Sequence, residues 1–445
     1  MKKSITLLLL LSFTLLLPAQ ELHPKRLTLE EIIAYALEHA PEKISQKMKV
    51  DEAKIRLDEA RLQHLPDIYA SGDLRRNLII PSTPVPAHLF DPNASEGELM
   101  YLRFNTTWNA SAGINLSYDL FSPEKVNRVG EQKQQLKIQQ YEEMLSEKKL
   151  REQIALAYAE CVIAGEQHRT CMQDTAYYAL LLRNAGDLST KEQLSLVKKN
   201  EIQKAYNEST ANCLRAKKIA ADVGANLLFL AGAKVTPETV GALQLEEDIP
   251  TLLGKMEQSA SPTTSTKELE VMKQHGMVSM AALRTRSAEW KYAPTLTLNG
   301  YLGTNYYNNE LQLFNDRYWR GNSYVGLSLK MPISQTLSTA KEVSRLRLQQ
   351  RLEEATLLEI RNRQEKERLQ EASQLAVQRE SYRLSRENMA MSEQNLQAAQ
   401  MQYEKGYILQ QELLSEQLKA QQARQNYLQA AYDLFTSLVS VEKKQ

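Results

Sequence analysis

Four segments of the chain alternate apolar and polar residues with a period of two, and they lie at 68–74, 109–120, 294–306 and 324–331. This period predicts β-strands that each have one apolar face. Each segment is near the length of about 9–11 residues that a tilted strand needs to cross a bilayer. Four strands cannot close a barrel, and an open edge in lipid would leave backbone N–H and C=O groups unpaired. Because small barrels have about eight strands or more, the pattern predicts that two or three chains share one barrel.

Two long stretches of the chain have the composition of helices. There is no proline between Pro123 and Pro237, and after Pro332 there is no proline and a single glycine, Gly406. Both stretches are rich in good helix formers, and their apolar residues recur every three or four positions, as in coiled coils. The helices predicted to end at Gly186 and Gly406 would be roughly 93 Å and roughly 110 Å long, against a bilayer core of about 30 Å. They are therefore expected to project from the membrane, turn at the two glycines and return.

The chain is predicted to be an internal duplication with an offset of roughly 210–230 residues. Residues 66–72 match 294–300, and residues 113–117 match 326–330. Gly186 precedes Glu192 by the same spacing by which Gly406 precedes Glu412. Each copy has the order helix, strand, loop, strand, long helix, turn, helix, which predicts a mixed, mainly α fold. We expect a first repeat at 20–231, a connector at 232–262 and a second repeat at 263–445.

Residues 1–19 have the composition of a secretory signal peptide. Lys2 and Lys3 precede an apolar run at 5–17, and Pro18-Ala19 offers a cleavage site after Ala19. The run is too short to span a bilayer, so export is expected, and an uncleaved anchor is the alternative. The chain has 55 basic and 54 acidic residues, a net charge of +1. This balance creates no field that would attract nucleic acid.

Candidate chemistry is sparse. The three cysteines, Cys161, Cys171 and Cys213, are an odd set for an exported protein that depends on disulfides. Cys161 and Cys171 would lie about 15 Å apart along one predicted helix, too far to bridge, and all three are predicted to be buried apolar residues. The chain has no Walker A loop, GxSxG, HExxH or CxxC motif. No catalytic residue, cofactor site or metal site is therefore predicted, and the protein is not expected to be an enzyme.

The three tryptophans, Trp108, Trp290 and Trp319, lie at the margins of the predicted strands, with tyrosines beside them. Aromatic girdles of membrane barrels have this distribution, because amphipathic rings sit at the level of the lipid headgroups. The alternative is an antiparallel sheet of a soluble protein in which these aromatic residues only pack. The segment at 75–107 is predicted to be a long loop outside the cell, since extracellular loops are the longer ones.

Several short runs, in their order along the chain, carry a resemblance to one protein family. They are LTLEEIIAYALEHAP at 27–41, Leu65-Pro66 before the first strand, SYDLF at 117–121, YEKG at 403–406 followed by ELL at 412–414, and the run 423–438 with Asn426-Tyr427. Through these runs the mature chain resembles the TolC-like outer-membrane efflux protein family over essentially its whole length. The order of the runs, the duplication and the predicted signal peptide make the resemblance fairly specific.

The resemblance implies a homotrimer with four transmembrane strands per chain in one twelve-stranded barrel, continued by a periplasmic tunnel of long coiled-coil hairpins. It implies an outer-membrane exit duct of a tripartite efflux or type I secretion system, in contact with outer-membrane lipid, a periplasmic adaptor and an inner-membrane pump. The chain itself has no energy-coupling motif and would conduct passively. The alternative function is a periplasmic coiled-coil scaffold or adaptor with a soluble sheet.

The resemblance also assigns residues to a periplasmic aperture, where the hairpins of the family turn. By position, Glu192 and Glu412 match acidic residues that ring the opening, and Tyr403 matches a residue that helps hold the closed state. Carboxylates in a narrow pore favour cations. This chain departs from the family at Ser415, where a second acidic residue would stand, so its ring would be less acidic. The alternative is that Glu192 and Glu412 are ordinary solvated helix residues.

Overall fold

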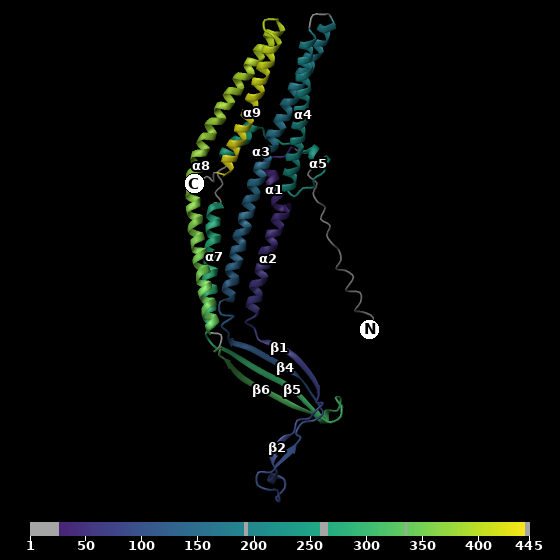
Figure 1. Cartoon of the computed structure of the whole chain (residues 1–445), viewed down its shortest axis with the longest axis vertical. Helices are drawn as coiled ribbons and strands as arrows, with labels where there is room; N and C mark the ends of the chain where they lie inside the picture. Colours follow the sequence, from purple (N-terminus) through teal and green to yellow (C-terminus); the bar gives the residue numbers. More distant parts are fainter. Residues whose placement is uncertain (1–25, 191–194, 259–265, 334–335, 441–445) are drawn as a thin grey trace. The chain divides into compact units, whose positions relative to one another are not determined.

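The computed structural model describes residues 26–190, 195–258, 266–333 and 336–440 (Figure 1). The predicted signal peptide at 1–19 and Glu192 lie outside the described residues. The chain divides into two compact units, one of residues 1–45, 144–266 and 364–445 and one of residues 46–143 and 267–363. Among the described residues, no helix combines the length and the apolar character needed to cross a membrane.

The first unit is helical. Its first helix begins at a capping box, in which Thr28 accepts a hydrogen bond from the backbone of Glu31 and the Glu31 carboxylate accepts one from the backbone of Thr28. The unit contains α1 (Leu29–His39), the later part of α3 (Arg128–Thr190), α4 (Leu196–Leu230), α5 (Pro237–Ala242), α6 (Ile249–Gln258), the later part of α8 (Thr336–Glu404) and α9 (Gln410–Ser440). The described part of the predicted connector, up to residue 258, thus holds the two short helices α5 and α6.

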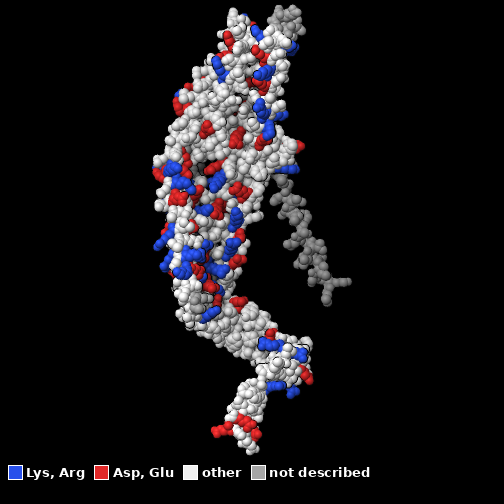
Figure 2. Space-filling model, in the orientation of Figure 1, with Lys and Arg blue, Asp and Glu red and all other residues white. Residues whose placement is uncertain are grey.

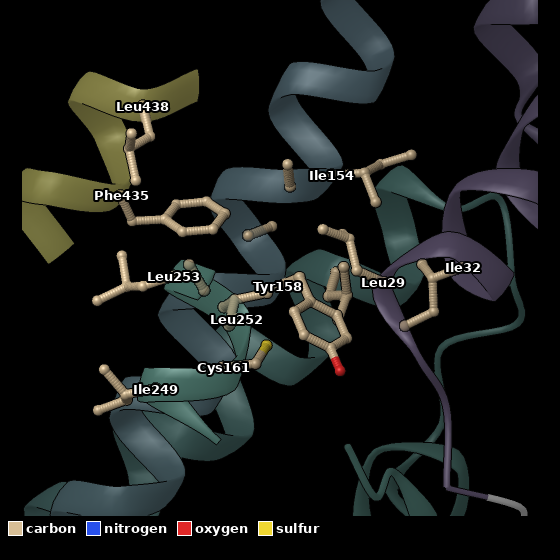
Figure 3. Packing of buried hydrophobic residues seen from close by; sticks show 14 of the residues in the cluster. Leu29, Ile32, Ile154, Tyr158, Cys161, Ile249, Leu252, Leu253, Phe435 and Leu438 are labelled. Carbon is tan, nitrogen blue, oxygen red and sulfur yellow. The ribbon is translucent and has the colours of Figure 1, made fainter. Parts of the chain in front are cut away.

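The core of this unit forms around Tyr158 of α3, whose side chain is fully buried (Figure 3). Residues from α1, α6 and α9 belong to the same buried cluster, among them Ile32, Leu252 and Phe435. The Tyr158 hydroxyl donates to a carboxylate oxygen of Glu247, which is itself buried and also accepts from Lys255 at 2.8 Å. Burial opposes ionisation of Glu247, but its hydrogen bonds with Lys255 and Tyr158 outweigh this effect and lower its pKa. The carboxylate therefore stays charged inside the core.

The second unit combines a sheet with helices. It contains α2 (Pro41–Leu62), the early part of α3, α7 (Thr266–Trp290), the early part of α8, and the strands β1 (Asp67–Arg76), β4 (Trp108–Phe121), β5 (Thr295–Asn308) and β6 (Trp319–Lys330). The strands form one antiparallel sheet in the order β1-β4-β5-β6, in which β4 pairs with β5. The four predicted strands are confirmed, and β6 begins five residues earlier than its alternating segment.

The segment at 75–107, predicted as a loop, contains a small ladder. Strand β2 (Thr83–Pro86) pairs antiparallel with β3 (Leu99–Leu102), and a short helix η1 (Ala87–Leu89) follows β2. Pro84 and Pro86 have no N–H to donate, so β2 can pair well on one side only. Because these prolines interrupt the alternation of apolar and polar residues, the pattern did not predict this strand. A second short helix, η2 (Asp316–Tyr318), precedes β6.

Candidate functional site

The register of the sheet gathers the apolar residues of all four strands on one face. Adjacent partners form continuous rows across the strands, such as Ile68–Leu116–Gly300–Val325 and Tyr118–Leu298–Leu327. The opposite face carries polar rows, such as Asp67–Ser117–Asn299–Gly326, and cross-strand hydrogen bonds such as Asn115 to Ser71 at 2.7 Å and Asn299 to Ser328 at 2.8 Å. The sheet is therefore amphipathic as a whole.

Within the part of the chain that the structure describes, most of the apolar face is exposed, although Tyr306 at one end of it is buried. Val325, Leu327, Leu329 and Leu302 are 78%, 66%, 70% and 68% exposed. A contiguous apolar surface of this kind marks a contact with another protein or with lipid. Figure 2 shows that on the face in view the charged side chains gather over the helices and near the strand ends, and that the strands between them are nearly free of charge.

The two edges of the sheet are open. Within the described residues, β1 pairs only with β4, and β6 pairs only with β5. Both edge strands are long, 10 and 12 residues, and β6 has its charged residues only near its ends, at Arg320 and Lys330. Soluble proteins usually blunt such edges with charge, proline or bulges, because an open edge pairs with other chains. The strand number is even, so a second copy can add its β1 to β6 in the antiparallel sense.

Aromatic residues mark both ends of the sheet. Trp108 and Trp319 begin β4 and β6 and lie at the same end, since they pair with Asn308 and Tyr306 of β5. Trp290 ends α7 at the opposite end, where its ring meets Phe121 edge-on at 6.0 Å. From Trp108 to Phe121 the strand extends about 44 Å, which at a tilt of about 45° spans about 31 Å, the thickness of a bilayer core.

The turn between α8 and α9 is built around Gly406, as the sequence predicts. Its φ is +76°, a left-handed conformation that glycine adopts without strain. The Gly406 N–H donates to the Tyr403 carbonyl at 2.9 Å and the Tyr407 N–H donates to the Gln402 carbonyl at 2.8 Å. These two bonds form a Schellman motif, which satisfies carbonyls at the end of a helix.

Gly186 does not have the corresponding role. Helix α3 continues through it to Thr190, and Gly186 is not among the described glycines with positive φ. The prediction that α3 ends at Gly186 is therefore wrong. A glycine inside a helix costs about 1 kcal/mol relative to alanine, which is too little to stop a long packed helix. The chain returns in α4, where the Ser195 side chain accepts from the Lys198 backbone at the N-cap.

The ends of the two hairpins pack together in one apolar cluster. It is formed by α3, α4, α8 and α9, through residues that include Leu181, Ile202, Leu396 and Leu413. Tyr403 is half-buried against this cluster, and Glu412 is exposed on the first turn of α9. The Gln410 side chain, at the start of α9, donates to the Lys198 carbonyl at the start of α4. The structure thus brings Tyr403, Gly406 and Glu412 to one hairpin end and leaves the three tryptophans at the sheet.

A buried ionic network joins the hairpins, and the sequence analysis missed it. Arg424 of α9 donates to Asp174 of α3 at 2.8 Å and to Glu393 of α8, and Gln417 of α9 donates to Asp174 at 3.0 Å. Asp174 and Arg424 have side chains only 12% and 18% exposed. Burial raises the pKa of Asp174, although the charge and hydrogen bonds of Arg424 act against it. No pattern of one helix reveals this network, because its members come from three helices.

The described residues contain no group of three or more His, Cys, Asp or Glu side chains that could hold a metal ion. No protein-family model and no curated protein matches the chain. Solved structures do match it. The CmeC outer membrane channel of Campylobacter jejuni has a TM-score of 0.74 at 14% identity, covering 92% of this chain and 84% of that one.

Two further structures agree with this match. CusC, whose structures concern folding and transmembrane channel formation, has a TM-score of 0.72 at 14% identity over 93% of this chain and 90% of that one. The open state of the Neisseria gonorrhoeae MtrE outer membrane channel has a TM-score of 0.69 at 14% identity over 93% and 89%. The chain therefore has the fold of these outer membrane channels.

Proposed function

We propose that the protein is an outer-membrane exit duct of a tripartite efflux or type I secretion system. The observation that carries this proposal is the sheet, which has one exposed apolar face, one polar face, two open edges and aromatic residues at both ends. An apolar face about 31 Å tall fits the lipid core, and the polar face fits a water-filled lumen. The fold shared with outer membrane channels supports the same conclusion.

The open edges support a closed oligomer. Backbone groups of β1 and β6 that face lipid must be paired, and pairing β6 of each copy with β1 of the next removes every edge. Three copies give a twelve-stranded barrel, in the size range of small membrane barrels. The helices would then form a periplasmic tunnel that meets an adaptor and an inner-membrane pump, with residues 1–19 acting as the export signal.

The hairpin ends are proposed as the periplasmic aperture. Tyr403 packs against the cluster that joins the hairpins, so it would lose contacts when the hairpins separate. Glu412 is exposed at the same end of the hairpin, so its carboxylate can face the opening. Gly186 lies in the last turns of α3, and it is proposed, together with Glu192 from its position in the sequence, to contribute to the same opening. Three copies of Glu412 would favour cations, so Glu412→Gln should lower the cation preference of the reconstituted channel.

The topology of the chain in living cells tests the proposal. In a variant whose native cysteines are serines, Ser95→Cys places a thiol between β2 and β3, and Ser415→Cys places one in α9. Both positions are exposed. A membrane-impermeant maleimide added to intact cells should label position 95, and it should label position 415 only after the outer membrane is permeabilised. Equal labelling of both positions only after permeabilisation would overturn the duct and favour a periplasmic scaffold.

A further inference from the structure

Buried and half-buried residues recur along the facing sides of α3 and α4, which defines a seam between the two helices. The two helices run antiparallel, and the hydroxyl oxygens of Thr175 and Ser209 lie 2.9 Å apart across the seam. Steps of three and four residues from this pair lead along α3 through positions 161, 164, 168, 171, 175 and 178, and along α4 through 223, 220, 216, 213, 209 and 206. Every one of these positions is buried or half-buried. This is the periodicity of a coiled-coil seam.

The seam places Cys171 opposite Cys213, one helical turn from the Thr175–Ser209 contact. Cys161 lies in an earlier layer of the seam, opposite Val223. Cys161 belongs to the apolar cluster around Tyr158, and Val223 packs against that cluster. The cysteines therefore differ: Cys161 is buried, whereas Cys171 and Cys213 are half-buried free thiols. The prediction that all three are buried apolar residues holds for Cys161 alone.

The surroundings of Cys171 agree with this pairing. Burial raises the pKa of its thiol, with Asp174 and Cys213 acting in the same direction and Arg424 against them, which lowers the fraction of reactive thiolate. Cys171 also lines a cavity of about 350 Å³ between α3, α4 and α9, on a side of the helix that is open to small molecules. A disulfide requires Cα atoms within roughly 7 Å, and the contact of the Thr175 and Ser209 hydroxyl groups brings the two helices close at the neighbouring layer.

We propose that Cys171 and Cys213 form a redox pair that closes an interhelical disulfide between α3 and α4. The oxidant is a disulfide, either of a small thiol such as glutathione or of a thiol oxidoreductase. One protein thiolate attacks it and releases one thiol, giving a mixed disulfide, and the second protein thiolate then displaces the other thiol. The two protein thiols lose two electrons and two protons, which reduce the oxidant to two thiols.

The bond would close a loop that contains the α3–α4 turn. It would limit the separation of the two helices about 29 Å from the end of α3 at Thr190. The proposal takes its oxidising compartment from the proposed function, because disulfides form and persist in the periplasm and not in the cytosol. The pairing of the two residues, in contrast, rests only on the seam.

Peptide mapping of the full chain tests the pair directly, because trypsin places each cysteine in its own peptide. Cleavage gives 152–169 with Cys161, 170–183 with Cys171 and 205–215 with Cys213. Protein extracted from cell envelopes is alkylated with iodoacetamide in denaturant and digested without reductant. Peptides 170–183 and 205–215 should be found linked, and reduction should separate them, while Cys161 should be alkylated.

Two variants control for geometry. In a chain with Cys171→Ser and Cys213→Ser, the pair Thr175→Cys and Ser209→Cys occupies the next seam layer and should also cross-link. In a chain with Cys213→Ser, the substitution Leu214→Cys lies one residue off the seam at an exposed position, and the link to Cys171 should be lost.

The outcomes separate this proposal from the duct. Outer-membrane protein in which Cys171 and Cys213 are both alkylated, even after purified protein is incubated with oxidised glutathione, would overturn the redox pair and leave the duct intact. Linked peptides that appear only with oxidised glutathione support the pairing and identify a small disulfide as sufficient. Linked peptides in a protein that fractionates away from the outer membrane support the pair and overturn the duct.

Discussion

An arginine on the apolar face of the sheet should block assembly, whereas an arginine on the polar face should not. Val325 lies near the middle of β6, with Trp319 and Lys330 at the strand ends, and is 78% exposed on the apolar face. Asn322, three residues away, lies on the polar face and is also exposed. In a soluble sheet both positions would face water, and surface substitutions there usually change stability by less than about 0.5 kcal/mol.

In lipid the two substitutions differ by a calculable amount. An arginine facing lipid near the midplane costs about 2–4 kcal/mol, which is a factor of about 30 to about 700 in the folding equilibrium of each chain. We would refold Val325→Arg, Asn322→Arg and the unchanged protein from urea into lipid vesicles and compare the folded fractions on unheated gels. We expect a deficit for Val325→Arg and near-normal folding for Asn322→Arg. Equal folded fractions for the two variants would refute the assignment of the apolar face to lipid.

Unfolding of the detergent-solubilised protein checks the other predictions. Arg424→Met should cost about 3–5 kcal/mol because it leaves the buried Asp174 without its partner, and adding Asp174→Asn should restore much of the loss. Burial already raises the pKa of Asp174 and removing the arginine raises it further, so the folded variant holds a proton that the unfolded chain releases, and its deficit should be smaller at about pH 5 than at about pH 7.5. Gly406→Ala should destabilise by about 1–2 kcal/mol, since its φ is +76°, whereas Gly186→Ala, where a new Cβ meets no described atom within 4 Å, should stabilise by about 0.5–1 kcal/mol. Tyr158→Phe should lose about 1.5–3 kcal/mol with its hydrogen bond to a buried carboxylate.

The strands could be predicted well because each one has an apolar environment on one face and a polar environment on the other, and the alternation of residues reflects both. The segment predicted at 109–120 is β4 at Trp108–Phe121, and its apolar and polar residues face opposite sides as expected. A slip of one residue moves every side chain to the other face of the sheet, so the alternation fixes which residues share a face, although it missed the first five residues of β6. The ladder of β2 and β3 escaped prediction because prolines replace its alternating residues.

The hairpin turns show why spacing alone is insufficient. Gly186 and Gly406 precede Glu192 and Glu412 by the same number of residues, yet only Gly406 ends its helix. Whether a helix continues through a glycine depends on the packing of the helix ends, which a single sequence does not reveal. The network of Arg424 depends in the same way on which faces of three helices point together.

The pairing of cysteines needed the register of two helices. Cys161 and Cys171 lie on one helix and are the pair that spacing brings to attention, and they cannot meet. Cys171 and Cys213 are 42 positions apart, and only the Thr175–Ser209 contact shows that their layers coincide. Composition and periodicity predicted helices, but not which residues of α3 and α4 face each other or the offset between the two helices.

The native mass of the protein extracted by detergent from fractionated envelopes is the most direct test of the duct. The account predicts an outer-membrane species of three chains, because a four-stranded sheet with two open edges cannot stand alone in lipid. A single chain in the soluble periplasmic fraction would contradict it, and the amphipathic sheet would then have to be explained by a partner protein.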